Sequence, residues 1–135
     1  MPKRKAKHIQ LSEHKSKELL FDKHQIDALV AIEIAFEDYD RCLVKMFCGT
    51  GKSRIALKKI IDADFAVIVM PTIALITQFN DSYLTEYAHL LQEKALLSIC
   101  SRDELKDQTI QYTTDVEEVV EFLEENDTKV VAAIP

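Results

Sequence analysis

Hydrophobic side chains recur along this chain with two spacings, one typical of helices and the other of buried strands. Within residues 21–40 they follow a helical spacing and form two stripes, which predicts a helix that is buried over much of its surface. The helical spacing returns in residues 52–63, from Thr72 onward and in residues 114–126, where we expect further helices. The two stripes of the first helix consist of Ile26, Leu29, Val30 and Ile34, and of Ala28, Ile32, Ala35 and Phe36.

Two of these helices carry start signals. Thr72 is expected to cap the helix that follows it, and Thr114 with Glu117 forms a capping box for the last helix. Each helix then shows an apolar side, which predicts that it packs against the rest of the protein. The apolar positions are Ile76, Phe79, Tyr83 and Tyr87 in one helix, and Val116, Val119, Val120 and Leu123 in the other.

Short apolar runs between the helices predict strands. An unbroken run from Phe65 to Met70 stops at Pro71 and is too short for a helix, which favours a strand covered on both faces. The other runs span residues 42–46, 95–100 and 129–134. Because strands alternate with helices, we expect a mostly parallel sheet between layers of helices, a three-layer α/β fold.

The composition fits one domain with a hydrophobic core, since 47% of the 135 residues are hydrophobic. No apolar run approaches the roughly 20 residues that a membrane span requires. The N-terminal MPKRKAK is followed by polar sequence and not by the apolar core of a signal peptide. We therefore expect an intracellular protein, cytoplasmic or nuclear, that is neither secreted nor bound to a membrane, and a viral source stays open.

Charge is distributed unevenly along the chain. Residues 1–24 hold seven Lys or Arg and three Asp or Glu, although the whole chain carries a net charge of −6. We therefore divide the chain into a basic extension, residues 1–20, and a domain, residues 21–135. A solvated tail is the simplest interpretation of the extension, and a nuclear-targeting or nucleic-acid-contacting arm is the alternative. The acidic domain gives no general electrostatic case for nucleic-acid binding.

The cysteines predict neither a disulfide framework nor a zinc site. Cys42, Cys48 and Cys100 form no C-x-x-C pair and have no histidine at ligand spacing. We expect reduced thiols.

The only two glycines of the chain, Gly49 and Gly51, both lie in the segment KMFCGTGKS, residues 45–53. A predicted strand, a loop that ends in Gly-Lys-Ser and a predicted helix are typical of the P-loop, in which backbone N–H groups surround a phosphate. Glycine fits such a loop because it adopts positive φ and leaves room for phosphate oxygens. The candidate nucleotide-binding residues are Cys48, Gly49, Thr50, Gly51, Lys52 and Ser53.

Lys52 and Ser53 carry the chemistry expected of this loop. The Lys52 ammonium is expected on the β- and γ-phosphates of ATP, and the Ser53 hydroxyl in the coordination sphere of Mg²⁺. Both are candidate catalytic residues, and Ser53 is the candidate metal ligand. Met46 stands where the pattern G-x-x-x-x-G-K-[ST] has its first glycine, and a chance Gly-Thr-Gly-Lys-Ser in an ordinary turn is the alternative.

The loop and its surroundings resemble the first RecA-like domain of superfamily 2 helicases and translocases, especially the branch of restriction-enzyme motor subunits and related viral and repair helicases. MFCGTGKS looks like motif I of that branch, in which a hydrophobic or small residue commonly replaces the first glycine. PTIALITQF, residues 71–79, resembles motif Ia. The resemblance implies that Thr72 and the backbone amide of Ile73 contact the phosphates of a nucleic-acid strand, and Gln78 matches the family's glutamine.

HQIDAL, residues 24–29, resembles the [YH]-Q-x-x-A segment of the same family, in which the glutamine reads adenine. Gln25 offers a donor and an acceptor to the N6/N7 edge of that base. Asp22 stands where the family often has a basic residue, three positions before the glutamine. Gln25 is therefore the candidate base-binding residue, and a structural glutamine in a buried helix is the alternative.

The resemblance covers residues 20–135 and the first part of the motif series. No predicted strand ends in the Asp-Glu pair that holds Mg²⁺ and positions the attacking water in these motors. Asp103 and Glu104 come after the run at 95–100, and we interpret them as a loop pair. We expect an incomplete RecA-like domain of the P-loop NTPase class, with the remaining helicase domains on a longer or separate chain.

These patterns predict the ATP-binding portion of a nucleic-acid-dependent ATPase or helicase, which binds ATP with Mg²⁺ and, in the complete motor, single- or double-stranded nucleic acid. The chain alone is expected to bind nucleotide weakly and to hydrolyse little of it. Two alternatives stay open. One is a non-catalytic P-loop remnant that acts as an interaction module through the acidic helix around residues 117–125, and the other is a small P-loop kinase.

Overall fold

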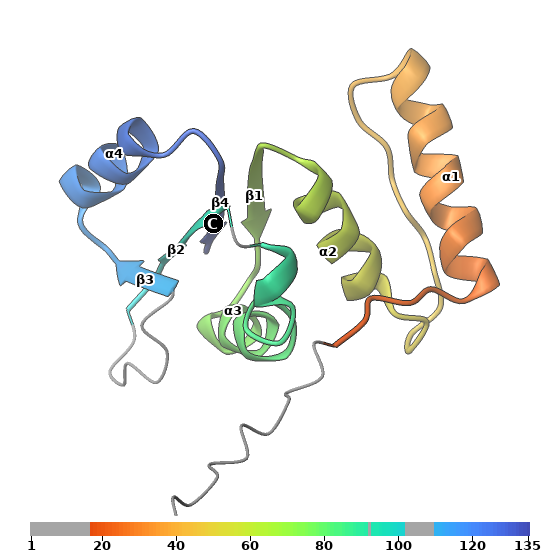
Figure 1. The fold of residues 1–135 in the computed structure, drawn as a ribbon, viewed down its shortest axis with the longest axis horizontal. Coiled ribbons are helices and arrows are strands. Elements are labelled where there is room, and N and C mark those ends of the chain that lie inside the picture. Colours follow the sequence, from red (N-terminus) through yellow and green to blue (C-terminus); the bar gives the residue numbers. More distant parts are fainter. Residues whose placement is uncertain (1–16, 92, 102–109) are drawn as a thin grey trace, which may run out of the picture.

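The computed structural model describes residues 17–91, 93–101 and 110–135 as an α/β fold (Figure 1). The predictions for Asp103, Glu104 and residues 1–16 lie outside these residues. None of the described helices is long and apolar enough to cross a bilayer. The elements are α1 (Lys23–Asp38), α2 (Lys52–Asp62), β1 (Phe65–Val69), α3 (Ile73–Phe79), a π-helical turn (Asn80–Leu84), a 3-10 turn (Ala88–Leu90), β2 (Ala95–Ile99), β3 (Ile110–Thr113), α4 (Val116–Glu125) and β4 (Lys129–Ala133).

The strands form a four-stranded parallel sheet in the order β1-β4-β2-β3. β4 lies between β1 and β2, so Val131 is paired with Val67 on one side and with Leu97 on the other. Parallel strands need crossover connections, and helices supply them here, since α3 follows β1 and α4 follows β3. The predicted parallel sheet is confirmed.

Helices pack on both faces of the sheet. Successive residues of a strand point to opposite faces, so Leu96 of β2 packs with Leu57 of α2 and Phe79 of α3 on one face. On the other face, Leu97 packs with Phe122 of α4. The three-layer α/β arrangement is therefore confirmed.

α2, α3, β2 and β4 begin where the sequence predicts them, within a residue. Thr72 is the N-cap of α3, and its hydroxyl oxygen accepts the N–H of Leu75 at 3.2 Å. The apolar side of this helix is buried at Ile76 and Phe79. It then continues as a π-helical turn, beyond which Tyr87 is 1% exposed.

The strand predicted at residues 42–46 is not formed. Residues 41–47 run back along α1, outside the sheet (Figure 1), and Leu43 and Phe47 are 80% and 88% exposed. A strand is held by hydrogen bonds to a neighbouring strand, and within the described sheet no strand pairs with this segment. The prediction of a strand leading into the loop is therefore wrong.

Two predictions of burial are also wrong. β1 is covered on one face only, because α4 packs over β2 and β4, and Val67 and Val69 of β1 remain 57% and 62% exposed. α1 is buried only at Gln25 and Ile32. It packs against α2 and not against the sheet (Figure 1), so its stripe through Val30 faces outward.

α4 begins one residue later than predicted. Asp115, and not Thr114, is its N-cap, and the Asp115 carboxylate accepts the N–H of Glu117 at 2.8 Å. The predicted capping box at this helix is therefore wrong. Its predicted apolar face is also wrong in part, since Val116 is 74% exposed whereas Phe122 is buried.

β3 is a strand that the sequence pattern did not predict. Its residues Ile110–Thr113 are buried at both ends and more exposed between them. The segment has only four residues and follows a polar stretch, so its apolar signal is weak. Pairing with β2 is what makes it a strand.

Candidate nucleotide-binding site

The loop between residues 47 and 51 is shaped by its two glycines. Gly49 has a φ of 76° and Gly51 a φ of 82°, and no other described residue has positive φ. Gly51 is the N-cap of α2. Left-handed backbone at these positions turns the chain from the extended segment into the first turn of the helix, as the sequence predicts for glycine.

Thr50 makes hydrogen bonds with both its side chain and its backbone. Its hydroxyl donates to the carbonyl of Phe47 at 2.6 Å, and its N–H approaches the same oxygen at 3.4 Å. Its carbonyl accepts from the Nε2–H of Gln25 at 3.0 Å and lies 3.1 Å from Nε2 of His24. The loop is thus closed on itself at one end and tied to α1 at the other.

The first turn of α2 offers backbone donors. Helix N-termini leave N–H groups without intrahelical partners and carry partial positive charge. Among the described residues, the N–H groups of Gly51, Lys52 and Ser53 have no hydrogen-bond acceptor. The Lys52 side chain is exposed and Ser53 is half-buried, so the residues predicted to bind phosphate and Mg²⁺ lie together at one helix end.

Gln25 is 4% exposed and both ends of its amide are engaged. Its Oε1 accepts the N–H of Asp22, the N-cap of α1, at 2.9 Å, which completes a capping box at the start of that helix. Its Nε2 donates to Thr50. An amide has two N–H groups and two acceptor positions, so Gln25 keeps one donor and one acceptor beyond these bonds.

The surroundings of Gln25 include a hollow of about 640 Å³ beside the first turn of α2. Phe21, Gln25, Arg54 and Tyr87 are among its lining residues. The guanidinium of Arg54 donates to the carbonyl of Leu20, while its Nε is buried without a partner. At the rim, a hydrogen bond to Glu86 raises the pKa of Lys17. This hollow has an aromatic wall and several polar groups.

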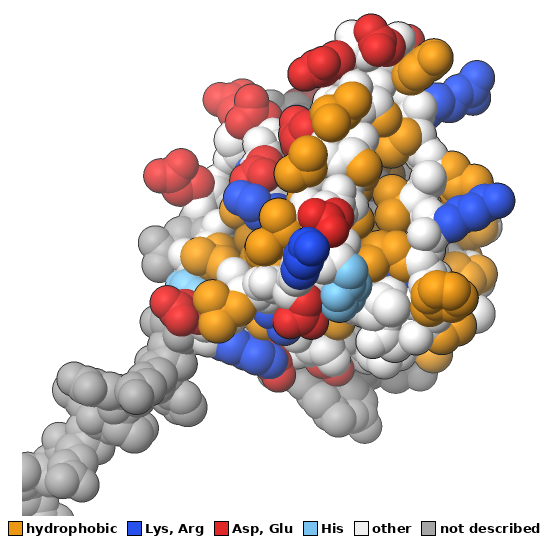
Figure 2. All heavy atoms as spheres, turned by 90° about the vertical axis from the view of Figure 1, so that its right-hand side faces the viewer, with side chains coloured by type: hydrophobic (Ala, Val, Ile, Leu, Met, Phe, Trp, Pro, Cys, Tyr) orange, Lys and Arg blue, Asp and Glu red, His pale blue; other side chains and the backbone are white. Residues whose placement is uncertain are grey.

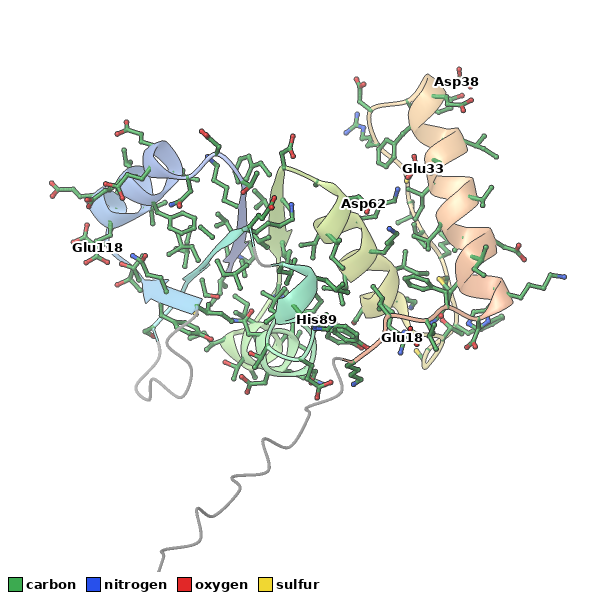
Figure 3. The ribbon with its side chains drawn as sticks, viewed as in Figure 1. Glu18, Glu33, Asp38, Asp62, His89 and Glu118 are labelled. Atoms are coloured by element: carbon green, nitrogen blue, oxygen red, sulfur yellow. The ribbon has the colours of Figure 1, made fainter. Side chains whose placement is uncertain are left out.

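A second, mainly apolar hollow of about 590 Å³ lies between α1 and α2. Ile32, Val44 and Ile55 line it, and Lys52 stands at its edge. Glu33 of α1 (labelled in Figure 3) forms an ion pair with Lys59 of α2, which lines this hollow. The loop thus enters α2 between two hollows, one polar and aromatic, and the other apolar.

Two residues at the site were not predicted from the sequence, His24 and Arg54. His24 occupies the first position of the [YH]-Q-x-x-A segment, which was a usable signal. Arg54 directly follows the Gly-Lys-Ser run. Nothing in the spacing of the sequence indicates that the Arg54 side chain contacts the carbonyl of Leu20, which precedes α1.

The structure brings Gln25 against the loop but leaves the motif Ia residues in a separate place. Thr72 and Ile73 begin α3 directly after β1, both exposed. α2 begins at the end of the molecule where β1 finishes (Figure 1), so loop and motif Ia lie toward the same edge of the sheet. Cys48 is an exposed free thiol in the loop, and Cys42 is exposed in the segment before it.

Comparison with known proteins identifies one family. The family model described as type III restriction enzyme, res subunit, matches residues 18–133 of the chain. No curated protein and no solved structure matches this chain.

Proposed function

This chain belongs to the family of the type III restriction enzyme res subunit, a family of helicase-type ATPase domains, and we propose that residues 48–53 bind ATP with Mg²⁺ in a partial RecA-like domain. The family generally uses ATP and Mg²⁺ and binds nucleic acid. The assignment of these roles to single residues of this chain is our proposal.

One observation carries the proposal most. Three consecutive N–H groups, those of Gly51, Lys52 and Ser53, have no acceptor among the described residues and lie at the N-terminus of α2. Such a set is a ready binding site for a phosphate, since the helix end adds positive potential. The exposed Lys52 ammonium stands beside it. These groups would bind the phosphates and orient them.

Ser53 fits the metal role in chemistry and position. Its hydroxyl oxygen is a hard ligand of the kind that Mg²⁺ prefers, and it follows the phosphate-binding lysine directly. Bound Mg²⁺ would neutralise charge on the phosphates. We propose that the carboxylates that complete the hydrolytic site of these motors are supplied by the remaining helicase domains, on a longer or separate chain.

For the base, we propose the hollow lined by Phe21, Gln25 and Arg54. Gln25 keeps one N–H and one acceptor position, which match the donor and acceptor on the adenine edge. For nucleic acid, we propose Thr72 and the amide of Ile73, at the N-terminus of α3. Both sites lie toward the edge at which the parallel strands end, where ligands of open α/β sheets commonly bind.

The direct test is isothermal titration of ATP·Mg²⁺ into the chain and into its Lys52→Ala variant. Lys58→Ala is the matched control, because Lys58 lies on the same helix and pairs with Asp62 at its other end. We expect Lys52→Ala to abolish measurable binding and Lys58→Ala to leave it within twofold. Equal weakening by both variants would indicate a non-specific charge effect and would overturn the assignment of Lys52.

Phosphate release with and without single-stranded DNA or RNA completes the test. Binding without turnover is the expected result for this chain. Turnover that depends on Lys52 would show that residues of this chain supply the hydrolytic carboxylates, which would contradict our proposal about the remaining domains.

A second candidate function is an interaction module that keeps the fold without using nucleotide. One observation favours it: Val67 and Val69 leave one face of β1 open. Absence of ATP binding in the wild-type chain would support this function and reject the first.

A further inference from the structure

The carbonyl of Thr50 is held by two side chains from the first turn of α1. Nε2 of Gln25 lies 3.0 Å from this oxygen and Nε2 of His24 lies 3.1 Å from it. A carbonyl oxygen has two acceptor positions, so both are used here. No other loop carbonyl among the described residues receives side-chain donors from α1.

The orientation of both donors follows from their partners. Gln25 must present its oxygen to the N–H of Asp22 and therefore its NH₂ group to Thr50. The Thr50 carbonyl has no proton to give, so Nε2 of His24 carries the proton in this contact. The Gln25 amide thus caps α1 with its oxygen and holds the loop with its NH₂ group.

Fixing this carbonyl fixes the next N–H as well. The peptide bond is planar and trans, so the C=O of Thr50 and the N–H of Gly51 point in opposite directions. Because the carbonyl points at α1, the N–H of Gly51 points away from it. This N–H has no acceptor among the described residues. A Cβ at Gly51 would lie 2.2 Å from Nε2 of Gln25, so the contact also requires glycine at this position.

We propose that His24 and Gln25 are positioning residues that turn the Thr50–Gly51 peptide so that the Gly51 N–H faces the phosphate groups of a bound ligand. The inference rests on the proposed function of the loop. It differs from base recognition, because it gives Gln25 a role toward any polyphosphate, with or without adenine, and it gives His24 a role that the sequence did not indicate.

The two roles of Gln25 are separated by inorganic tripolyphosphate, which has phosphates and no base. The experiment titrates tripolyphosphate with Mg²⁺ and ATP with Mg²⁺ into the wild-type chain and into Gln25→Met, His24→Leu and the double variant. We expect each single variant to bind both probes about 3- to 10-fold more weakly, the range that one lost hydrogen bond produces. His24 is exposed, so its effect should fall at the lower end.

The fold loss of affinity in the double variant should exceed the product of the fold losses in the two single variants, because one donor still orients the peptide in each single variant. His24→Gln keeps an N–H donor and should recover much of the affinity. His89→Leu makes the same change at a histidine that lines a separate hollow, in which no residue of the loop takes part. It should bind both probes as the wild type does.

A second readout needs no ligand. The carbonyl carbon of Thr50 and the amide of Gly51 are observed by NMR in the free protein, and loss of either donor should shift both signals, while His89→Leu should leave them unchanged. Unchanged signals in folded Gln25→Met and His24→Leu would overturn the proposal. If Gln25→Met weakened the binding of ATP and left the binding of tripolyphosphate unaffected, Gln25 would act through the base and the positioning role would be wrong.

The same two readouts distinguish failure of the underlying function. One outcome is that the variants shift the NMR signals relative to the wild type while the wild-type chain binds neither probe. That result would reject the proposed function, and with it the phosphate-directed role, but would confirm the hydrogen bonds. Binding of both probes with shifted signals and unchanged affinities in every variant would reject the positioning role alone.

Discussion

Gly49 and Gly51 have similar backbone conformations and different surroundings. Both have positive φ, at 76° and 82°. A Cβ at Gly49 would meet nothing within 4 Å, whereas one at Gly51 would meet Nε2 of Gln25 at 2.2 Å. In the free protein, Gly49 is therefore needed for its backbone alone and Gly51 for its backbone and its lack of a side chain.

This contrast predicts unequal costs for the same substitution. Gly49→Ala should lower the free energy of unfolding by about 1–2 kcal/mol, the usual cost of left-handed backbone for a residue with a Cβ. Gly51→Ala should cost more, because displacing the Gln25 amide also leaves buried polar groups unpaired. Urea unfolding measures both. In a double-mutant cycle, Gly51→Ala should couple to Gln25→Ala and Gly49→Ala should not; equal coupling would contradict the contact at Gly51.

Cys48 provides a chemical probe of the same loop. Cys48 and Cys42 are both exposed thiols, and Cys100 is buried. If residues 48–53 bind ATP, then ATP·Mg²⁺ should slow the alkylation of Cys48 severalfold and affect Cys42 much less, as measured by peptide mass spectrometry. Lys52→Ala should remove the protection. Protection of both cysteines to the same degree would indicate a general change in structure and not a ligand over the loop.

The sequence indicated the candidate phosphate-binding residues but not the contacts that support their loop. Gly49, Gly51, Lys52 and Ser53 follow from a local motif, because backbone freedom, charge and a hydroxyl are properties of the residues themselves. The contact of His24 and Gln25 with the Thr50 carbonyl joins segments 25 or 26 residues apart. Such a contact depends on how α1 sits on α2, which no local pattern specifies.

α1 shows the same limit for a whole element. The sequence predicts this helix from its helical spacing, yet its apolar stripes do not reveal which side is covered. Ile32 is 7% exposed and Ile34 is 57% exposed, although the sequence gives both the same character. The helix is held by few buried groups, so it should open more readily than the sheet.

Hydrogen exchange tests this with a matched pair. Ile32→Ala removes a side chain packed between α1 and α2 and should speed amide exchange along α1, with β2 unchanged. Ile34→Ala makes the same change on the same helix at an exposed position and should have little effect. Exchange that rises equally in both variants would mean that helix propensity, and not docking through Ile32, holds α1 in place.

The molecule as a whole has a buried core in and around its sheet, and exposed apolar side chains on α1, on the segment after it and on β1. Figure 2 views the side on which α1 lies, where hydrophobic side chains are spread over the surface. The exposed apolar residues of α1, of the segment after it and of β1 include Ile26, Val30, Ile34, Leu43, Phe47, Phe65, Val67 and Val69. Sequence patterns predicted the parallel sheet and its layers. They overestimated burial, because an apolar run indicates which residues favour a core and not whether a neighbouring element covers them.

The open face of β1 predicts that this chain associates with itself, because exposed apolar strands at a sheet edge favour pairing with other chains. Val67 and Val131 are paired in register on adjacent strands, one 57% exposed and the other 4% exposed. Val67→Thr should change the free energy of unfolding by no more than about 0.5 kcal/mol and reduce association in sedimentation velocity. Val131→Thr should cost about 1–3 kcal/mol, because it buries a hydroxyl. Association that persists unchanged in Val67→Thr at every concentration would place the contact elsewhere, and the exposed stripe of α1, with Val30→Thr as the variant, would be the surface to measure next.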